Sequence, residues 1–238
     1  MQTFISETLK LIISQQKSFE NSIIVLPSQR AGVFLKQELK KELSVGFLPR
    51  ILNIEEFIEE VTSFKKIDTV QLLFHFYTVY KNTEKQTEAF DSFFSWAITV
   101  LQDFNEVDQH LVNSKDLFNY IKDIERLKNW SVDKPIEETK LMKNHFSFME
   151  KLDVYYSELY KYLTDRKIGY QGLIYREAAR EIEEYARKNN HKKFYFIGFN
   201  ALNKAEEYLF QQMLIQGNTE LFWDIDEVFL NSKHQAGT

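Results

Sequence analysis

The segment Ser22-Ile-Ile-Val-Leu-Pro27, followed by Ala31 to Leu43 and by Pro49-Arg-Ile-Leu52, decides the fold class of this chain. The first segment is apolar, rich in β-branched residues and ends at a proline, which is typical of a buried strand. The second has helical spacing, and the third is another short strand. Within the helix we expect four apolar residues to point toward the core, namely Phe34, Leu35, Leu39 and Leu43. Three lysines, Lys36, Lys40 and Lys41, are expected to point toward the solvent. A strand, a helix and a strand at this spacing predict a parallel sheet.

The sequence on either side extends this α/β pattern. A helix is expected from Ser6 onward, before the first strand. After the second strand, Asn53 and Glu56 form a capping box that opens a helix over Ile54–Ser63. Near the other end we expect a strand at Lys193–Gly198 and a second capping box at Asn203 and Glu206. This box opens a helix that reaches Leu214, and a last strand follows at Glu220–Asp224. Neither half alone buries enough surface, so the strands of both ends are expected to share one sheet.

The middle of the chain changes character, because no convincing strand occurs from Asp68 to about Lys188. Asp68 and Gln71 are typical of a helix cap and its partner, and the helix they open is expected to reach Tyr80. Gly169 is typical of a helix stop. Further apolar stripes at helical spacing occupy residues 90–111, 117–127, 146–163 and 174–185. These stripes predict a helical subdomain.

We therefore predict an α/β protein whose parallel sheet is split in sequence by a large all-helical insert. The first part of the α/β core is expected at 1–66 and the helical insert at 67–190. The core is expected to continue at 191–238 and to be incomplete at its C-terminal end. The composition agrees, because 7 glycines and 3 prolines are too few for the turns of a sandwich or barrel of many short strands.

The composition also excludes several kinds of site. The chain has no cysteine, which excludes a disulfide framework, a thiolate metal site and cysteine catalysis. It has no long uncharged apolar run and no signal-peptide pattern, so we expect no membrane contact and a cytoplasmic location. The net charge of −5 argues against a long electrostatic surface for nucleic acid but leaves a local DNA contact open.

Sequence patterns for catalysis are scarce. A phosphate-binding loop needs glycines followed by Lys and Ser or Thr, and no Gly-Lys-Ser or Gly-Lys-Thr occurs. The five histidines stand far apart, so we expect neither zinc catalysis nor a cofactor. Asp224, Asp226 and Glu227 cluster after the last strand, and Asp224 with Asp226 is the candidate pair for Mg²⁺. A solvated strand end explains this cluster more simply.

Ser28, Gln29 and Arg30 form the most informative polar group. They follow a strand and stand at a helix N-terminus, where backbone amides and the helix dipole attract an anion such as a phosphate. The alternative is that Ser28 caps the helix and Arg30 is merely solvated, and the spacing alone favours this alternative. These three residues are the candidates for contact with DNA.

An ordered series of segments spans nearly the whole chain, and no single one is a decisive motif. The segments are Ile24–Leu35, Leu48–Ile54, Phe93–Ala97 with Leu101–Asp108, Ile168–Arg176, Phe196–Glu206 and Phe222–Asp226. In this order they resemble AddB-like proteins of Bacteroidetes, which are inactivated superfamily I helicases carrying a PD-(D/E)XK nuclease domain. The third and fourth segments fit that family's Trp-Gly-x-x-x-Leu-x-Asp-Phe-Asp-x-x-Asp pattern, in which Asp103 and Asp108 would help to close the helical insert.

The resemblance implies an N-terminal helicase-like domain similar to parts of AddB and RecC subunits. The α/β segments would form a RecA-like (P-loop NTPase-like) core, the helical insert would handle DNA, and a nuclease would lie beyond the C-terminal end. The phosphate loop of active relatives is missing, and Ile197 stands where they carry an acidic metal-binding residue. Without that acid, Mg²⁺ and water cannot be positioned for phosphoryl transfer. The resemblance also places the Ser28–Arg30 loop where active relatives contact the single-strand backbone.

The sequence thus favours a catalytically inactive helicase-like domain that guides DNA in double-strand-break repair and recombination. Its expected partners are single-stranded DNA, in contact with Ser28, Gln29 and Arg30, and a partner helicase-nuclease subunit. The alternative is a protein-interaction module that docks a partner helicase subunit without touching DNA, which the acidic net charge supports. A nuclease using Asp224 and Asp226 is a third interpretation, and we expect this fragment not to be an enzyme.

Overall fold

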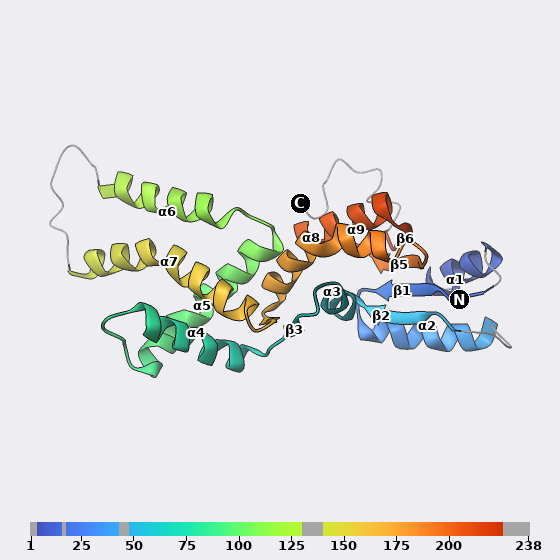
Figure 1. Cartoon of the computed structure of the whole chain (residues 1–238), viewed down its shortest axis with the longest axis horizontal. Coiled ribbons are helices and arrows are strands. Elements are labelled where there is room, and N and C mark those ends of the chain that lie inside the picture. Colours follow the sequence, from blue (N-terminus) through green and yellow to red (C-terminus); the bar gives the residue numbers. More distant parts are fainter. Residues whose placement is uncertain (1–3, 16–17, 43–47, 130–139, 226–238) are drawn as a thin grey trace. The chain divides into compact units, whose positions relative to one another are not determined.

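The computed structural model describes residues 4–15, 18–42, 48–129 and 140–225 (Figure 1). The chain divides into two compact units. The first, called here the sheet unit, comprises Met1–Ser63 and Glu177–Thr238. The second, called the helical unit, comprises Phe64–Arg176.

The sheet unit contains a four-stranded parallel sheet. Its strands are β1 (Ser22–Leu26), β2 (Arg50–Asn53), β5 (Lys193–Phe199) and β6 (Asn218–Trp223), in the order β2-β1-β5-β6. β1 pairs with β2 on one side and with β5 on the other, and every pairing is parallel. Both the parallel sheet and the sharing of one sheet by the two ends of the chain are therefore confirmed.

Helices cover both faces of this sheet, which explains why all five residues of β1 are buried. On one face lie α1 (Phe4–Gln15) and α2 (Gln29–Glu42). Their apolar residues form one cluster with the strands, made of Leu9, Ile12, Phe19, Ile24, Leu26, Leu35, Leu39, Tyr195 and Ile197.

The opposite face of the sheet is packed by aromatic rings. α3 (Ile54–Thr62) places Phe57 against Phe194 and Phe196 of β5, with ring centres 6.3 Å and 5.3 Å away. α9 (Lys204–Gln216) places Phe210 against Phe196 at 4.5 Å. The sheet is thus the middle layer of three.

The expected inward position of Phe34 is wrong. The buried residues of α2 are Gly32, Leu35 and Leu39, whereas the Phe34 side chain is 49% exposed. Each helical residue turns about 100° from its neighbour, so a stripe centred on Leu35 and Leu39 leaves Phe34 at its edge. The three lysines of α2 are exposed as expected, and Leu43 lies outside the described residues.

The helical unit is built from α4 (Thr69–Thr83), α5 (Phe90–Gln109), α6 (Ser114–Asn129), α7 (Lys140–Thr164) and the first turns of α8 (Gln171–Lys188). α6 and α7 run side by side, as Figure 1 shows. The core of this unit is aromatic, and the rings of Phe76, Phe93, Trp96, Phe104 and Tyr155 contact one another.

The expectation of no strand in the middle segment is also wrong. β3 (Lys65–Lys66) and β4 (Ile168–Gly169) form a short parallel ladder. Gly169 is consequently a strand residue and not a helix stop, because α7 already ends at Thr164 and the turn is made with a positive φ of 52° at Lys167. A two-residue strand has no periodicity from which it could be predicted.

The units divide at residues 63/64 and 176/177, whereas the sequence placed the boundaries at 66/67 and 190/191. The second boundary moves because the last three turns of α8 pack on the sheet. Tyr185 of α8 contacts Phe57 and Phe194 at 5.8 Å and 6.3 Å between ring centres. No helix in the described part of the chain is both long and apolar enough to cross a membrane.

Candidate functional site

The carboxyl edge of the sheet gathers the residues that begin three helices. Because the strands are parallel, β1, β2 and β5 all end at this edge, and α2, α3 and α9 begin there. The chain leaves β1 toward β2 on one side, and β5 lies on the other side of β1. In open α/β sheets, ligands bind at the carboxyl ends of the strands where the strand order reverses in this way.

The sequence candidates Ser28, Gln29 and Arg30 lie at this edge, between the end of β1 and the first turn of α2, and all three are exposed. The Ser28 hydroxyl accepts a hydrogen bond from the amide of Ala31 at 3.2 Å, so Ser28 does cap α2. The Arg30 guanidinium lies 5.8 Å from the centre of the Phe34 ring. Contact of these residues with phosphate stays a prediction.

The three helix starts at this edge differ in charge. In α3 the Glu56 carboxylate accepts a hydrogen bond from the backbone amide of Asn53 at 2.9 Å. In α9 the Glu206 carboxylate accepts one from the backbone amide of Asn203 at 3.1 Å. These carboxylates offset the positive end of each helix dipole. α2 has no acidic residue in its first turn and carries Arg30 there. Of the three starts, that of α2 is therefore the most attractive to an anion.

The connection from β1 to α2 is only Pro27-Ser28, and neither residue is a glycine. Two residues without glycine cannot wrap their amides around a phosphate chain as a P-loop does. Ile197 lies inside β5 and is fully buried, so it offers no ligand where the resemblance would place a metal-binding acid. The described connection between β1 and α2 is therefore not a P-loop.

The candidate metal pair is only partly described. Asp224 follows β6 and is exposed, and its amide donates to the carbonyl of Phe199 at 3.2 Å. Asp226 and Glu227 lie outside the described residues. Within the described part of the chain, no three His, Cys, Asp or Glu side chains gather as a metal site would require.

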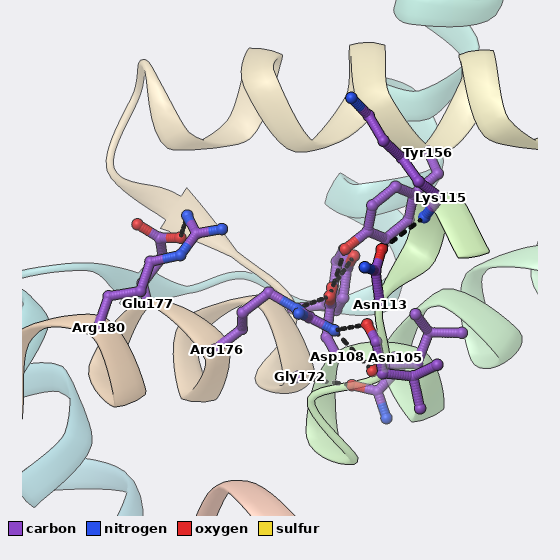
Figure 2. A network of polar contacts seen from close by, with 12 residues as sticks. Asn105, Asp108, Asn113, Lys115, Tyr156, Gly172, Arg176, Glu177 and Arg180 are labelled. Atoms are coloured by element: carbon purple, nitrogen blue, oxygen red, sulfur yellow. Dashed lines mark hydrogen bonds and ion pairs between the residues drawn. The ribbon is translucent and has the colours of Figure 1, made fainter. Parts of the chain in front are cut away.

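The helical unit contains a buried polar network, of which the sequence singled out only Asp108, as a residue that with Asp103 would help to close the helical insert. Asp108, near the end of α5, is fully buried, and Figure 2 shows Tyr156 and Arg176 pointing at its carboxylate. The hydroxyls of Tyr156 and Tyr170 and the Nε of Arg176 all donate to Asp108. This single carboxylate thereby links α5 to α7, to the residue after β4 and to the start of α8.

Backbone groups complete the network. The Nη2 of Arg176 donates to the carbonyls of Val107 at 2.8 Å and Val112 at 2.7 Å, where the chain leaves α5. The amide of Gly172 donates to the Asn105 Oδ1 at 2.8 Å. A Cβ at Gly172 would lie 2.3 Å from the Asn105 carbonyl oxygen, so the close approach of α8 to α5 requires glycine.

The electrostatics of the network indicate a structural role. Burial raises the pKa of the Asp108 carboxyl, while the two tyrosine hydroxyls and Arg176 act in the opposite direction. Burial and the neighbouring Asp108 raise the pKa of Tyr156 and of Tyr170, so both hydroxyls stay protonated and donate. By contrast, Asp103 on the same helix is exposed.

Comparison with known proteins adds no assignment to this geometry. No protein-family model matches the chain, and no curated protein is detectably similar to it.

Proposed function

We propose that this chain is the catalytically inactive, RecA-like N-terminal region of an AddB/RecC-like helicase-nuclease subunit and that it guides single-stranded DNA. The DNA backbone would contact Ser28, Gln29 and Arg30 at the carboxyl edge of the sheet. The observation that carries this proposal is the start of α2, which has an exposed arginine and no acidic residue in its first turn. The ordered resemblance of the sequence supplies the class of protein.

The physical argument rests on local donors. The first amides of an α-helix have no acceptor within the helix, and those of Gln29 and Arg30 lie in the exposed first turn of α2. A phosphate oxygen can accept from these amides while its charge pairs with Arg30. Such contacts position a nucleic acid backbone without reading its bases, which is what a guiding surface needs.

Titration of a fluorescent oligothymidylate at low salt tests the DNA contact. Arg30→Ala should weaken binding by about tenfold, the value of one charge-assisted hydrogen bond to phosphate. Arg187→Ala, which removes an exposed arginine from α8 of the same unit, is the matched control and should leave the affinity unchanged. If the Arg30→Ala and Arg187→Ala variants bind the oligonucleotide with equal affinity, Arg30 does not contact the DNA. Hydrolysis of ATP by the purified chain would contradict the inactive-motor part.

The alternative of a protein-interaction module is favoured by one observation in the helical unit. Val70 and Phe74 of α4 and Phe94 of α5 are exposed, and the Phe74 ring stacks on Phe90 at 5.4 Å. Exposed apolar patches of this kind mark interaction surfaces. A pull-down with the partner helicase subunit separates the two functions. Retention of that subunit without any DNA binding in low salt would favour docking over guiding.

A further inference from the structure

A pocket in the helical unit is walled by four aromatic rings. It has a volume of about 290 Å³ and lies between α4, α5 and α7. Trp96 stacks on Tyr155 with ring centres 6.0 Å apart and meets Phe148 edge-to-face at 5.0 Å. Tyr80 closes the set, 5.7 Å from Trp96. Aromatic faces carry negative electrostatic potential, so walls of this kind attract cations.

Two carboxylates line the pocket, and the first of them, that of Glu84, already has two partners within the chain. The Glu84 carboxylate forms an ion pair with Lys151 at 2.6 Å and accepts the hydroxyl of Tyr155 at 2.7 Å. Burial opposes ionisation of Glu84, but the hydrogen bonds from Lys151 and Tyr155 prevail and lower its pKa. The charges of Glu84 and Lys151 therefore cancel within the pocket.

The second carboxylate belongs to the exposed Glu88, whose backbone is fixed by two hydrogen bonds and whose carboxylate keeps acceptor capacity. Its backbone amide donates to the Tyr80 hydroxyl at 3.2 Å, and its carbonyl accepts from the Tyr77 hydroxyl at 3.1 Å. One carboxylate oxygen accepts the Trp96 indole N–H at 3.4 Å. Within the described ranges no Lys, Arg or His forms an ion pair with Glu88. Among the described residues, the Glu88 carboxylate is therefore an exposed negative charge without an ion-pair partner, beside the aromatic wall.

We propose that this pocket binds the guanidinium group of an arginine side chain. A guanidinium is a planar monocation that stacks on aromatic faces and donates hydrogen bonds in its own plane, so it can use the Trp96 wall and the Glu88 carboxylate together. A quaternary ammonium would use the rings but not the carboxylate, because it has no N–H to donate. The guanidinium can belong to an arginine of a bound peptide or to free arginine, and the experiments below distinguish these two sources.

The indole N–H of Trp96 reports on the pocket directly, because it donates to Glu88. We would titrate the ¹⁵N-labelled chain with N-acetyl-arginine amide and assign the Trp96 signal with a Trp96→Phe variant. The expected result is a saturable shift of this signal in the millimolar range. N-acetyl-citrulline amide has nearly the same shape without the charge, and it should produce no saturable shift. Equal shifts with both probes would overturn the proposal.

Variants and a second probe test the roles of the carboxylate and of hydrogen bonding. Glu88→Gln preserves shape and should weaken arginine binding by at least about tenfold, the effect of losing a charge-assisted hydrogen bond. Glu106→Gln removes an exposed carboxylate from α5 of the same unit and should change nothing. Tetramethylammonium binding as tightly as the arginine probe would refute recognition of guanidinium. A peptide containing arginine should bind tighter than free arginine, and the reverse order would assign the site to the free amino acid. Since these titrations contain no DNA, their failure leaves the proposed DNA contact untouched.

Discussion

Replacing Asp108 with asparagine should strongly destabilise the helical unit. The carboxylate of Asp108 accepts three donors, from Tyr156, Tyr170 and Arg176. An asparagine offers one acceptor oxygen and turns an NH₂ group toward these donors, which leaves the Arg176 charge without its counterion. Breaking a buried ion pair costs about 3–5 kcal/mol. Because the side chain of Arg176 remains 14% exposed, we expect a loss near the lower end, about 3 kcal/mol of unfolding free energy.

Urea denaturation followed by near-ultraviolet circular dichroism measures this loss, because the core of the unit is aromatic. With a urea dependence of about 2 kcal/mol per M, the midpoint should fall by about 1.5 M. Asp103→Asn makes the same chemical change on an exposed residue of α5 and should stay within about 0.5 kcal/mol of the wild type. If the Asp108→Asn and Asp103→Asn variants unfold at the same midpoint, the network does not stabilise the unit and its role must be sought elsewhere.

Two further outcomes follow from the packing. Burial and the nearby Glu220 raise the pKa of Tyr195 to about 12, so the folded state holds its proton more tightly than the unfolded state. Its contribution to stability is complete below the ordinary tyrosine pKa of about 10 and is lost as the pH rises toward 12. In urea denaturation at a series of alkaline pH values, the unfolding free energy of the Tyr195→Phe variant should therefore fall less than that of the wild type. The Tyr120→Phe variant, which changes an exposed tyrosine, is the control and should follow the wild type. Gly172→Ala should lower the melting temperature, because its methyl group would collide with the Asn105 carbonyl, at a cost of about 1–3 kcal/mol. An unchanged thermal scan would show that α8 can move away from α5.

The sheet unit could be predicted where local chemistry alone determines structure. The apolar run at Ser22–Leu26 can be satisfied only as a strand buried on both faces, and that is where the sheet has its centre. The capping boxes at Asn53 and Asn203 fix the starts of α3 and α9 within single helical turns, and both are present. Each of these signals uses residues within a few positions of one another.

The features that were missed depend on residues far apart in the chain. Tyr156, Tyr170 and Arg176 stand 48, 62 and 68 positions beyond Asp108, so no spacing pattern links them before the chain folds. β3 consists of two exposed lysines and exists only because β4 lies beside it. A sequence signal for the network did exist in Asp108 itself, an acidic residue in the apolar stripe of α5, since a buried carboxylate requires partners.

The acidic net charge of the chain has little effect on a DNA contact at Arg30. Exposed charges more than about 8 Å away are largely screened at physiological ionic strength, so a phosphate at Arg30 responds mainly to its immediate surroundings. There it meets the amide end of α2, whose first turn carries no acidic residue. A contact made through Arg30 alone neutralises one phosphate, for which the logarithm of the binding constant falls with the logarithm of salt concentration at a slope of about −0.7. A much steeper slope would require further cations than Arg30, and a slope of zero would leave docking of a protein partner as the better account of this chain.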